Sequence, residues 1–171
     1  MSSGRALAYI GLGANLGDAH GTLMRALAEL GSLPGTRLRR RSRLYRSAPV
    51  QADGPDFLNG VAELDTGLTA MALLDHLQAI ERAHGRERPW PNAPRTLDLD
   101  LLMHGDSTLN DARLVLPHPR LHLRAFVLAP LSELRADLVV PGHGPIAALL
   151  AACTAQRCDP VTGVDVPPVA P

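Results

Sequence analysis

The sequence predicts an α+β fold with a ferredoxin-like split βαβ core, in which an antiparallel sheet carries helices on its faces and long mobile loops connect the elements. Two segments show apolar residues at helical spacing, and strand-like segments lie before, between and after them. The resulting order is strand, helix, strand, strand, helix, strand, which is the split βαβ pattern. A length of 171 residues fits a single domain.

The first half of the chain supplies three of the four expected core strands. Residues 5–12 (RALAYIGL) are expected to form the first, and the turn-rich GANLGD after them leads into a helix with leucines on one face. Gly31 indicates where that helix ends. The second and third strands are expected at 36–47 (TRLRRRSRLYRS) and 57–66 (FLNGVAELDT), with a proline- and glycine-rich loop at 48–56 between them.

The second half begins with a clear helical pattern at 69–84. The segment 85–95 (GRERPWPNAPR) has three prolines and no apolar period, so it is expected to be an exposed loop that precedes the strand RTLDLDLL. Later elements are expected as a short TLN segment, the loop RLVLPHPRLH, a helix near 124–134, a strand at LVVP, a small helix at 145–153 and a disordered tail at 159–171, which leaves 1–158 as the single domain.

Composition excludes several classes of function. The formal net charge is zero, which argues against broad attraction to nucleic acids or membranes. All 17 residues counted as lysine or arginine are arginine, so a phosphate site must use guanidinium groups, and a P-loop lysine is excluded. We see no signal peptide, no apolar run of membrane-spanning length, and only two cysteines, Cys153 and Cys158. We therefore expect a soluble, cytoplasmic protein in a reducing compartment.

The stretch RTLDLDLL holds two aspartates on one face of a strand. Side chains alternate along a strand, so Asp98 and Asp100 point one way, about 6 to 7 Å apart, while the leucines point the other way. Paired carboxylates stay ionised together only when a cation or basic groups compensate them. A hard cation such as Mg2+, which binds carboxylate and phosphate oxygens, fits this need. A solvated outer strand face is the alternative interpretation.

Basic side chains bracket the two aspartates. A metal-bound polyphosphate needs both kinds of group, because guanidinium and imidazole groups can bind the phosphate oxygens that the cation leaves uncovered. Each basic residue taken alone is typical of a protein surface. The bracketing residues are Arg86, Arg88 and Arg95 upstream and Arg113, His118, Arg120, His122 and Arg124 downstream.

Three other interpretations have weaker support. The glycine-rich GLGANLG lacks the dinucleotide-binding spacing, since Leu16 stands where a glycine is needed, and it fits a tight strand-to-helix turn. The arginine-rich segment 37–46 could bind RNA, but the aromatic platform of such sheets is missing. A nucleotidyltransferase also uses a strand-borne D-x-D with two metals, but it needs a Gly-Ser helix start upstream that PWPNAPRT does not supply.

Several motifs appear in the order and spacing of one enzyme family. They are YIGLGANLGD (9–18), YRSAPV (45–50), DFLNGV (56–61), GRER followed by a tryptophan (85–90), PRTLDLDLL (94–102) and LPHPRLHLRAFVLAPL (116–131). Over roughly residues 6–150 the sequence resembles 6-hydroxymethyl-7,8-dihydropterin pyrophosphokinase, a family of the folate pathway.

The resemblance implies that the hydroxymethyl oxygen of the pterin attacks the β-phosphorus of ATP and that AMP leaves. It implies two Mg2+ ions held by Asp98 and Asp100. It also implies a mobile loop with Trp90 as its lid, closing over the reaction. The implied catalytic residues are Arg86, Arg88, Arg95, Asp98, Asp100 and His118, and the implied ATP contacts are Gln78, Arg86, Arg88, Trp90, Arg95, Leu101, Arg113, His118 and Arg124.

For the pterin, the resemblance implies two stacked phenyl rings, from Phe57 and Phe126, and an amide, from Asn59, that reads the ring edge. Core packing is the alternative for both phenylalanines. The remaining implied pterin contacts are Trp90, Asp98 and the backbone of Ser47, Ala48, Pro49 and Val50. The implied partners are ATP and 6-hydroxymethyl-7,8-dihydropterin, and we expect a monomer that binds neither nucleic acid nor membrane.

Overall fold

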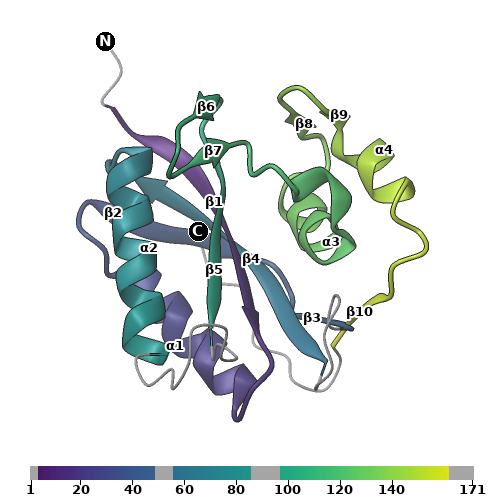
Figure 1. Ribbon diagram of the computed structural model, residues 1–171, viewed down its shortest axis with the longest axis horizontal. Helices are drawn as coiled ribbons and strands as arrows, with labels where there is room; N and C mark the ends of the chain where they lie inside the picture. The colour runs from purple at the N-terminus through teal and green to yellow at the C-terminus, as the bar shows by residue number, and fades with distance from the viewer. Residues whose placement is uncertain (1–3, 49–55, 86–96, 162–171) are drawn as a thin grey trace.

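The computed structural model describes residues 4–48, 56–85 and 97–161 (Figure 1). Its main sheet has six strands in the order β10-β3-β4-β1-β5, with β2 also paired to β4. All of these pairings are antiparallel. The strands are β1 (Ala6–Ala14), β2 (Thr36–Arg41), β3 (Tyr45–Ser47), β4 (Phe57–Thr66), β5 (Asp98–His104) and β10 (Cys158–Pro160).

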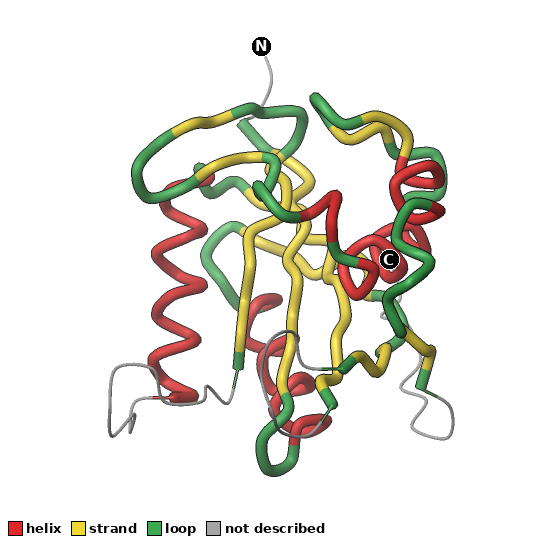
Figure 2. Tube along the Cα trace, turned by 45° about the vertical axis from the view of Figure 1, so that its right-hand side comes forward, coloured by secondary structure: helices red, strands yellow, loops and turns green. Residues whose placement is uncertain are grey.

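The helices cover the sheet on both faces (Figures 1 and 2). Helices α1 (Ala19–Gly31) and α2 (Ala70–Gly85) lie on one face, and α3 (Ala125–Leu134) and α4 (Ile146–Ala151) lie on the other. The predicted ferredoxin-like α+β class is confirmed, because β2 and β3 together, β4, β1 and β5 reproduce the split βαβ order. The smaller elements are β6 (Leu109–Asn110), β7 (Val115–Leu116), η1 (Leu121–Leu123), β8 (Val139–Val140) and β9 (Gly144–Pro145).

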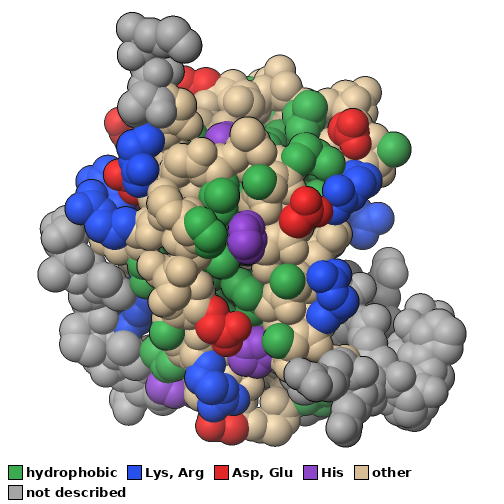
Figure 3. Space-filling model, turned by 90° about the vertical axis from the view of Figure 1, so that its left-hand side faces the viewer, with side chains coloured by type: hydrophobic (Ala, Val, Ile, Leu, Met, Phe, Trp, Pro, Cys, Tyr) green, Lys and Arg blue, Asp and Glu red, His purple; other side chains and the backbone are tan. Residues whose placement is uncertain are grey.

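Each sheet face has its own apolar core, and successive side chains of β1 point alternately into one core and the other. Ala8, Ile10 and Leu12 pack among the leucines of α1 and α2. Tyr9 points the opposite way, into a cluster with Val127 and other residues of the α3 face. Figure 3 views the side that carries α2, where acidic and basic side chains are interspersed over the described surface. No helix among residues 4–48, 56–85 and 97–161 is both long and apolar enough to cross a bilayer.

Two sequence predictions need correction at their boundaries. The strand expected at 36–47 is interrupted between β2 and β3, because the buried Ser42 hydroxyl accepts a hydrogen bond from the Val61 amide at 2.9 Å and donates one to the Arg43 carbonyl at 2.7 Å. At the other end, Asp159 and Pro160 were predicted to begin a tail. They lie in β10, which pairs with β3.

Candidate active site

A pocket of about 210 Å³ opens on the α3 face of the sheet, over the ends of β1, β4 and β5. It lies where a strand-borne carboxylate pair, two phenyl rings, an amide and a guanidinium meet. Its lining residues are Gly11, Leu12, Gly13, Ser47, Ala48, Phe57, Asn59, Gly60, Asp98, Asp100, Arg124, Phe126 and Val127.

The pocket exists because β1 carries glycine where its side chains would face it. Gly11 pairs with Asp100 and Gly13 with Asp98 on β5, so both glycines lie between β5 and β4. A Cβ atom on Gly13 would meet the Asn59 Nδ2 atom at 3.1 Å, closer than ordinary contact. The prediction of a tight turn at GLGANLG did not include this role. The available signal was two glycines two residues apart inside a strand, which marks close approach by a ligand or backbone.

The two aspartates project into the pocket as the strand alternation requires. Leu99 and Leu101 pack in the α1/α2 core, and Asp98 and Asp100 line the pocket. Basic groups face the Asp100 carboxylate at a distance. The His118 Nε2 atom lies 4.0 Å from Oδ1 and the Arg124 Nη1 atom 4.0 Å from Oδ2, beyond hydrogen-bond reach. Asp100 thus has basic groups nearby without a direct hydrogen bond to either His118 or Arg124.

His118 is held in one orientation beside Asp100. Its backbone N–H donates to the Leu102 carbonyl at 2.9 Å, and its ring Nδ1 atom accepts from the Arg120 N–H at 3.1 Å. Burial lowers the pKa of His118, and the charges of Arg124 and Arg120 lower it further, against the opposing effect of Asp100. The ring is therefore neutral at pH 7. Because Nδ1 is an acceptor, the proton sits on Nε2, which faces the carboxylate.

The phenyl rings and the amide line the other side of the pocket. Phe57 comes from β4 and Phe126 from the first turn of α3. Asn59 is buried, and its Oδ1 atom accepts from the Ser47 hydroxyl at 2.6 Å. The donor end of the amide, Nδ2, therefore points toward the glycine floor. Arg124 lies over the Phe126 ring, 5.5 Å from its centroid, which places a cation beside a flat apolar wall.

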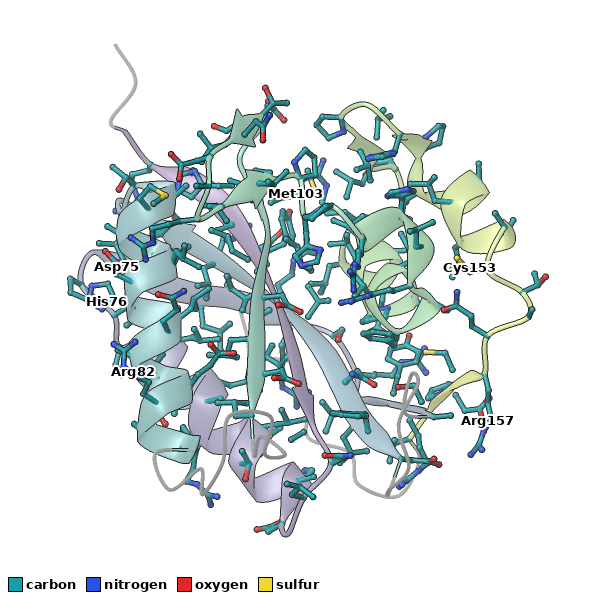
Figure 4. The ribbon with its side chains drawn as sticks, in the orientation of Figure 1. Asp75, His76, Arg82, Met103, Cys153 and Arg157 are labelled. Carbon is teal, nitrogen blue, oxygen red and sulfur yellow. The ribbon has the colours of Figure 1, made fainter. Side chains whose placement is uncertain are left out.

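Two further predicted residues meet outside the pocket. Arg113 donates from Nη2 to the Gln78 Oε1 atom at 3.2 Å, although the two are far apart in sequence. The same Nη2 atom also donates to Asp75 at 2.6 Å, and Figure 4 labels Asp75 on α2. Asp75 was not among the predicted site residues. An acid one helical turn before Gln78 was the only available signal.

The sequence matches the model of the 7,8-dihydro-6-hydroxymethylpterin-pyrophosphokinase (HPPK) family over residues 9–136. The chain belongs to this family.

Relatives of the HPPK family are similar over most of the chain. A 2-amino-4-hydroxy-6-hydroxymethyldihydropteridine pyrophosphokinase of Pseudomonas aeruginosa is 46% identical over 156 residues, which cover 91% of this chain and 96% of that protein. The protein of the same name from Haemophilus influenzae is 42% identical over 144 residues, covering 84% and 90%.

Solved structures support the fold. The wild-type HPPK-DHPS of Plasmodium falciparum with SDX-DHP superposes with a TM-score of 0.72 at 13% identity, over 88% of this chain and 45% of that one. The chain thus spans less than half the length of that protein, and the likeness concerns the fold alone.

Some predicted residues cannot be placed in the site. Arg120 is exposed, and the His122 ring stacks on His143 with centroids 3.8 Å apart. The Leu101 side chain is buried in the α1/α2 core. Pro49, Val50, Arg86, Arg88, Trp90 and Arg95 lie outside the described residues.

The donor set of this HPPK-family site suits Mg2+. Asp98 and Asp100 offer hard carboxylate oxygens at the pocket, and His118 and Arg124 each lie 4.0 Å from the Asp100 carboxylate. Within residues 4–48, 56–85 and 97–161, no group of three or more His, Cys, Asp or Glu side chains could form a metal cage. Mg2+ is usually bound by one or two carboxylates, with substrate phosphates and water as the other ligands.

Proposed function

We propose that the chain transfers a pyrophosphoryl group from ATP to the hydroxymethyl group of 6-hydroxymethyl-7,8-dihydropterin. The pterin hydroxyl oxygen attacks the β-phosphorus, the bond from that phosphorus to the α–β bridging oxygen breaks, and AMP leaves with the bridging oxygen. Membership of the HPPK family supports this reaction, and the names of the bacterial relatives describe it. The product is the pterin diphosphate, and the reaction is a step of folate biosynthesis.

One structural observation carries the proposal. The carboxylates of Asp98 and Asp100 share a pocket with two phenyl rings and a buried amide, over a floor of glycine. A flat, polar heterocycle needs aromatic walls and a few directed hydrogen bonds, and a triphosphate needs metal and guanidinium groups. The pocket puts both requirements within one small volume, so the acceptor alcohol and the phosphate chain can meet.

The pterin would lie between Phe57 and Phe126, with its edge at Asn59. The Ser47 hydroxyl holds the Asn59 amide so that Nδ2 is the end available as a donor. Backbone groups of Ser47 to Val50 would complete the hydrogen bonds. In this pose the hydroxymethyl group lies toward Asp98, at the boundary between the aromatic walls and the carboxylates.

The phosphates would lie over β5. Asp98 and Asp100 would hold two Mg2+ ions, which supply neutralisation of the triphosphate charge. His118 is neutral with its proton on Nε2, so it can donate a hydrogen bond to a phosphate oxygen. Arg124 is held beside the pterin wall and can pair with the transferred group. Catalysis then comes from positioning and charge neutralisation, with no covalent intermediate.

The rest of the ATP site would extend toward α2. Gln78 and Arg113 are in contact with each other and would contact the nucleotide. Arg86, Arg88, Arg95 and Trp90 would act from the loop that closes over the reaction. We further propose that the chain works as a cytoplasmic monomer that binds neither nucleic acid nor membrane.

The test is to incubate the protein with Mg-ATP, with and without 6-hydroxymethyl-7,8-dihydropterin, and to separate the nucleotide products by chromatography. AMP that forms only when the pterin is present is the expected result. Formation of ADP would instead indicate an ordinary kinase reaction, and pterin-linked AMP with release of pyrophosphate would indicate a nucleotidyltransferase. Either outcome would contradict the proposal.

A further inference from the structure

The C-terminal segment 153–161 runs from the end of α4 along the outside of the pocket to the edge of the sheet. Figure 4 labels Cys153 at its start and Arg157 further along it. Cys153 is buried in the α3-face core, so the segment is anchored where it begins. It lies beyond residues 9–136, the part matched by the HPPK family model. None of the residues to which the proposed function gives a role lies in this segment.

The side chain of Gln156 holds the backbone on both sides of Arg124. Its Oε1 atom accepts from the Ala125 N–H at 2.8 Å, and its Nε2 atom donates to the Leu123 carbonyl at 2.7 Å. The Leu123 carbonyl belongs to the peptide plane before Arg124, and the Ala125 N–H belongs to the plane after it. Two hydrogen bonds from one amide therefore fix both dihedral angles of Arg124, at φ −122° and ψ 111°.

These bonds explain how an arginine can occupy the N-cap of α3. The first N–H groups of a helix lack partners within it, and Ser, Thr, Asp or Asn usually supplies one from the N-cap. Arg124 makes no such capping bond. Gln156 satisfies the Ala125 N–H from outside the helix. The Arg124 side chain can therefore face Asp100 and the Phe126 ring.

The same segment holds two other walls of the pocket. Arg157 pairs with Asp56 at 3.2 Å, directly before Phe57. Cys158 pairs with Ser47 in the antiparallel ladder between β10 and β3, and the Val161 N–H donates to the Leu44 carbonyl at 2.9 Å. One stretch of chain thus contacts the start of α3, the start of β4 and strand β3.

We propose that Gln156 is a positioning residue, which acts by holding the backbone of Arg124 so that the guanidinium meets the phosphate chain of the substrate. The proposal rests on the proposed function, because it assumes that Arg124 contacts a phosphate. Gln156 itself is exposed at the outside of the segment and is absent from the pocket lining. Its effect on turnover must therefore pass through Arg124.

The test compares Gln156→Ala with Thr154→Ala, a matched control at an exposed position of the same segment. Gln156→Ala should lower kcat/KM for Mg-ATP about tenfold, because small displacements of a positioning group are costly in rate, whereas Thr154→Ala should stay within about twofold of wild type. Hydrogen exchange measured by NMR should show faster exchange of the Ala125 amide only in Gln156→Ala. Thermal unfolding checks that both variants fold.

A double-mutant cycle separates positioning from a general effect on the fold. Once Arg124→Ala has removed the guanidinium, adding Gln156→Ala should lower kcat/KM by less than about a further twofold. A full tenfold loss in both backgrounds would overturn the proposal, as would an unchanged Ala125 exchange rate or unchanged turnover in Gln156→Ala. A wild-type chain that forms no AMP would count against the proposed function instead. The exchange rate of Ala125 would then decide by itself whether Gln156 holds this backbone.

Discussion

The α3 face of the sheet has a closed end and an open end, built on the same two strands. At the closed end, β1 contributes Tyr9 and β4 contributes Glu63, which are paired in register and both buried. At the open end, β1 contributes Gly13 and β4 contributes Asn59, also paired in register. A shift of four residues along each strand therefore changes a filled polar core into a pocket.

At the closed end the protein satisfies its own charges. Tyr9 donates to the Glu63 Oε2 atom at 2.5 Å, and Arg40 donates to both Glu63 oxygens at 3.1 and 3.2 Å. Arg135 donates to the Tyr9 hydroxyl at 3.1 Å. Burial, together with the hydrogen bond to Glu63, raises the pKa of Tyr9 to about 12.

At the open end, the basic groups that face Asp100 from the described part of the chain, His118 and Arg124, lie 4.0 Å away, beyond hydrogen-bond reach. Charges paired by the protein's own groups contribute to stability but cannot bind a substrate. Charges held apart contribute little to stability, and they remain available to a metal ion or a phosphate. Residues paired at the closed end hold the fold, and the charged residues at the open end are the ones proposed to act on ligands.

The largest expected effect is at the open end. Asp98→Ala or Asp100→Ala should lower kcat by about three orders of magnitude, or about 4 kcal/mol in activation free energy, because metal-bound charge neutralisation is lost. For Asp100→Ala the free energy of unfolding should stay the same or rise, since a like-charge pair is removed. Steady-state AMP formation and urea unfolding measure the two quantities. Near-normal turnover in either variant would mean that the pair does not hold the metal.

A substitution at the closed end should lower stability and leave turnover nearly unchanged. Glu63→Gln keeps the volume but removes the charge that compensates Arg40, and it should cost about 2 kcal/mol of unfolding free energy. The cost lies below that of a fully buried pair because the Arg40 side chain is 37% exposed. Turnover should change less than about threefold, since the network lies outside the site. Glu133→Gln is the control, because Arg43, its ion-pair partner, is 58% exposed and Tyr45 still has a hydrogen-bond acceptor in the glutamine; it should lower stability less than Glu63→Gln does. Equal stability losses in both variants would contradict the distinction.

A smaller effect is expected from filling the floor of the open end. Gly13→Ala should raise the KM for the pterin about tenfold, because its Cβ would displace the Asn59 amide that lies 3.1 Å away. Gly11→Ala places its Cβ at 3.5 Å from Leu102, an ordinary contact, and should have a weaker effect. Pterin titrations of both variants by steady-state kinetics make the comparison. A larger rise in KM for Gly11→Ala than for Gly13→Ala would show that displacement of the Asn59 amide does not determine pterin binding.

The smallest expected effect is a difference in how stability depends on pH. Burial opposes ionisation of Glu63, but hydrogen bonds from Arg40 and Tyr9 and the arginine charges outweigh it, so its pKa lies below the ordinary value of 4.5. As the pH falls, the unfolded chain binds the proton first, so the stabilisation by Glu63 is present above pH 4.5 and is lost as the pH falls through the folded pKa. Urea unfolding between neutral and acidic pH should show a steeper loss for wild type than for Glu63→Gln. If the unfolding free energies of the two proteins fell in parallel with pH, Glu63 would not contribute to the loss of stability in acid.

Local patterns in the sequence predicted most of the core elements. The strand expected at 57–66 matches β4, and the helix expected at 69–84 differs from α2 by one residue at each end. The helix has apolar residues at helical spacing, whereas β4 is buried along most of its length, on both faces of the sheet. The alternation of Leu99 and Asp100 likewise predicted which side chains reach the pocket.

The missed features depend on contacts between distant parts of the chain. Gly13 forms the floor only because β4 and β5 flank β1. Gln156 sits in a polar segment with no period, and nothing local indicates that it would reach the start of α3. The Ser42 interruption of the second predicted strand likewise depends on Val61 of the neighbouring strand. Periodicity in the sequence predicts which face of a helix or strand is buried, but it does not predict which residue from a distant part of the chain contacts that face.

The pairing of β10 with β3 also determines when the pocket can be completed during synthesis. Strands β1, β4 and β5 leave the ribosome early and can form a sheet while translation continues. The pocket wall at Ser47 gains its neighbour Cys158 only after more than a hundred further residues have been synthesised. A nascent chain stalled at residue 150 would carry the aspartate pair and both phenyl rings without the Gln156 bonds to the start of α3. The order of translation thus places completion of the pocket wall after synthesis of the strands beneath it.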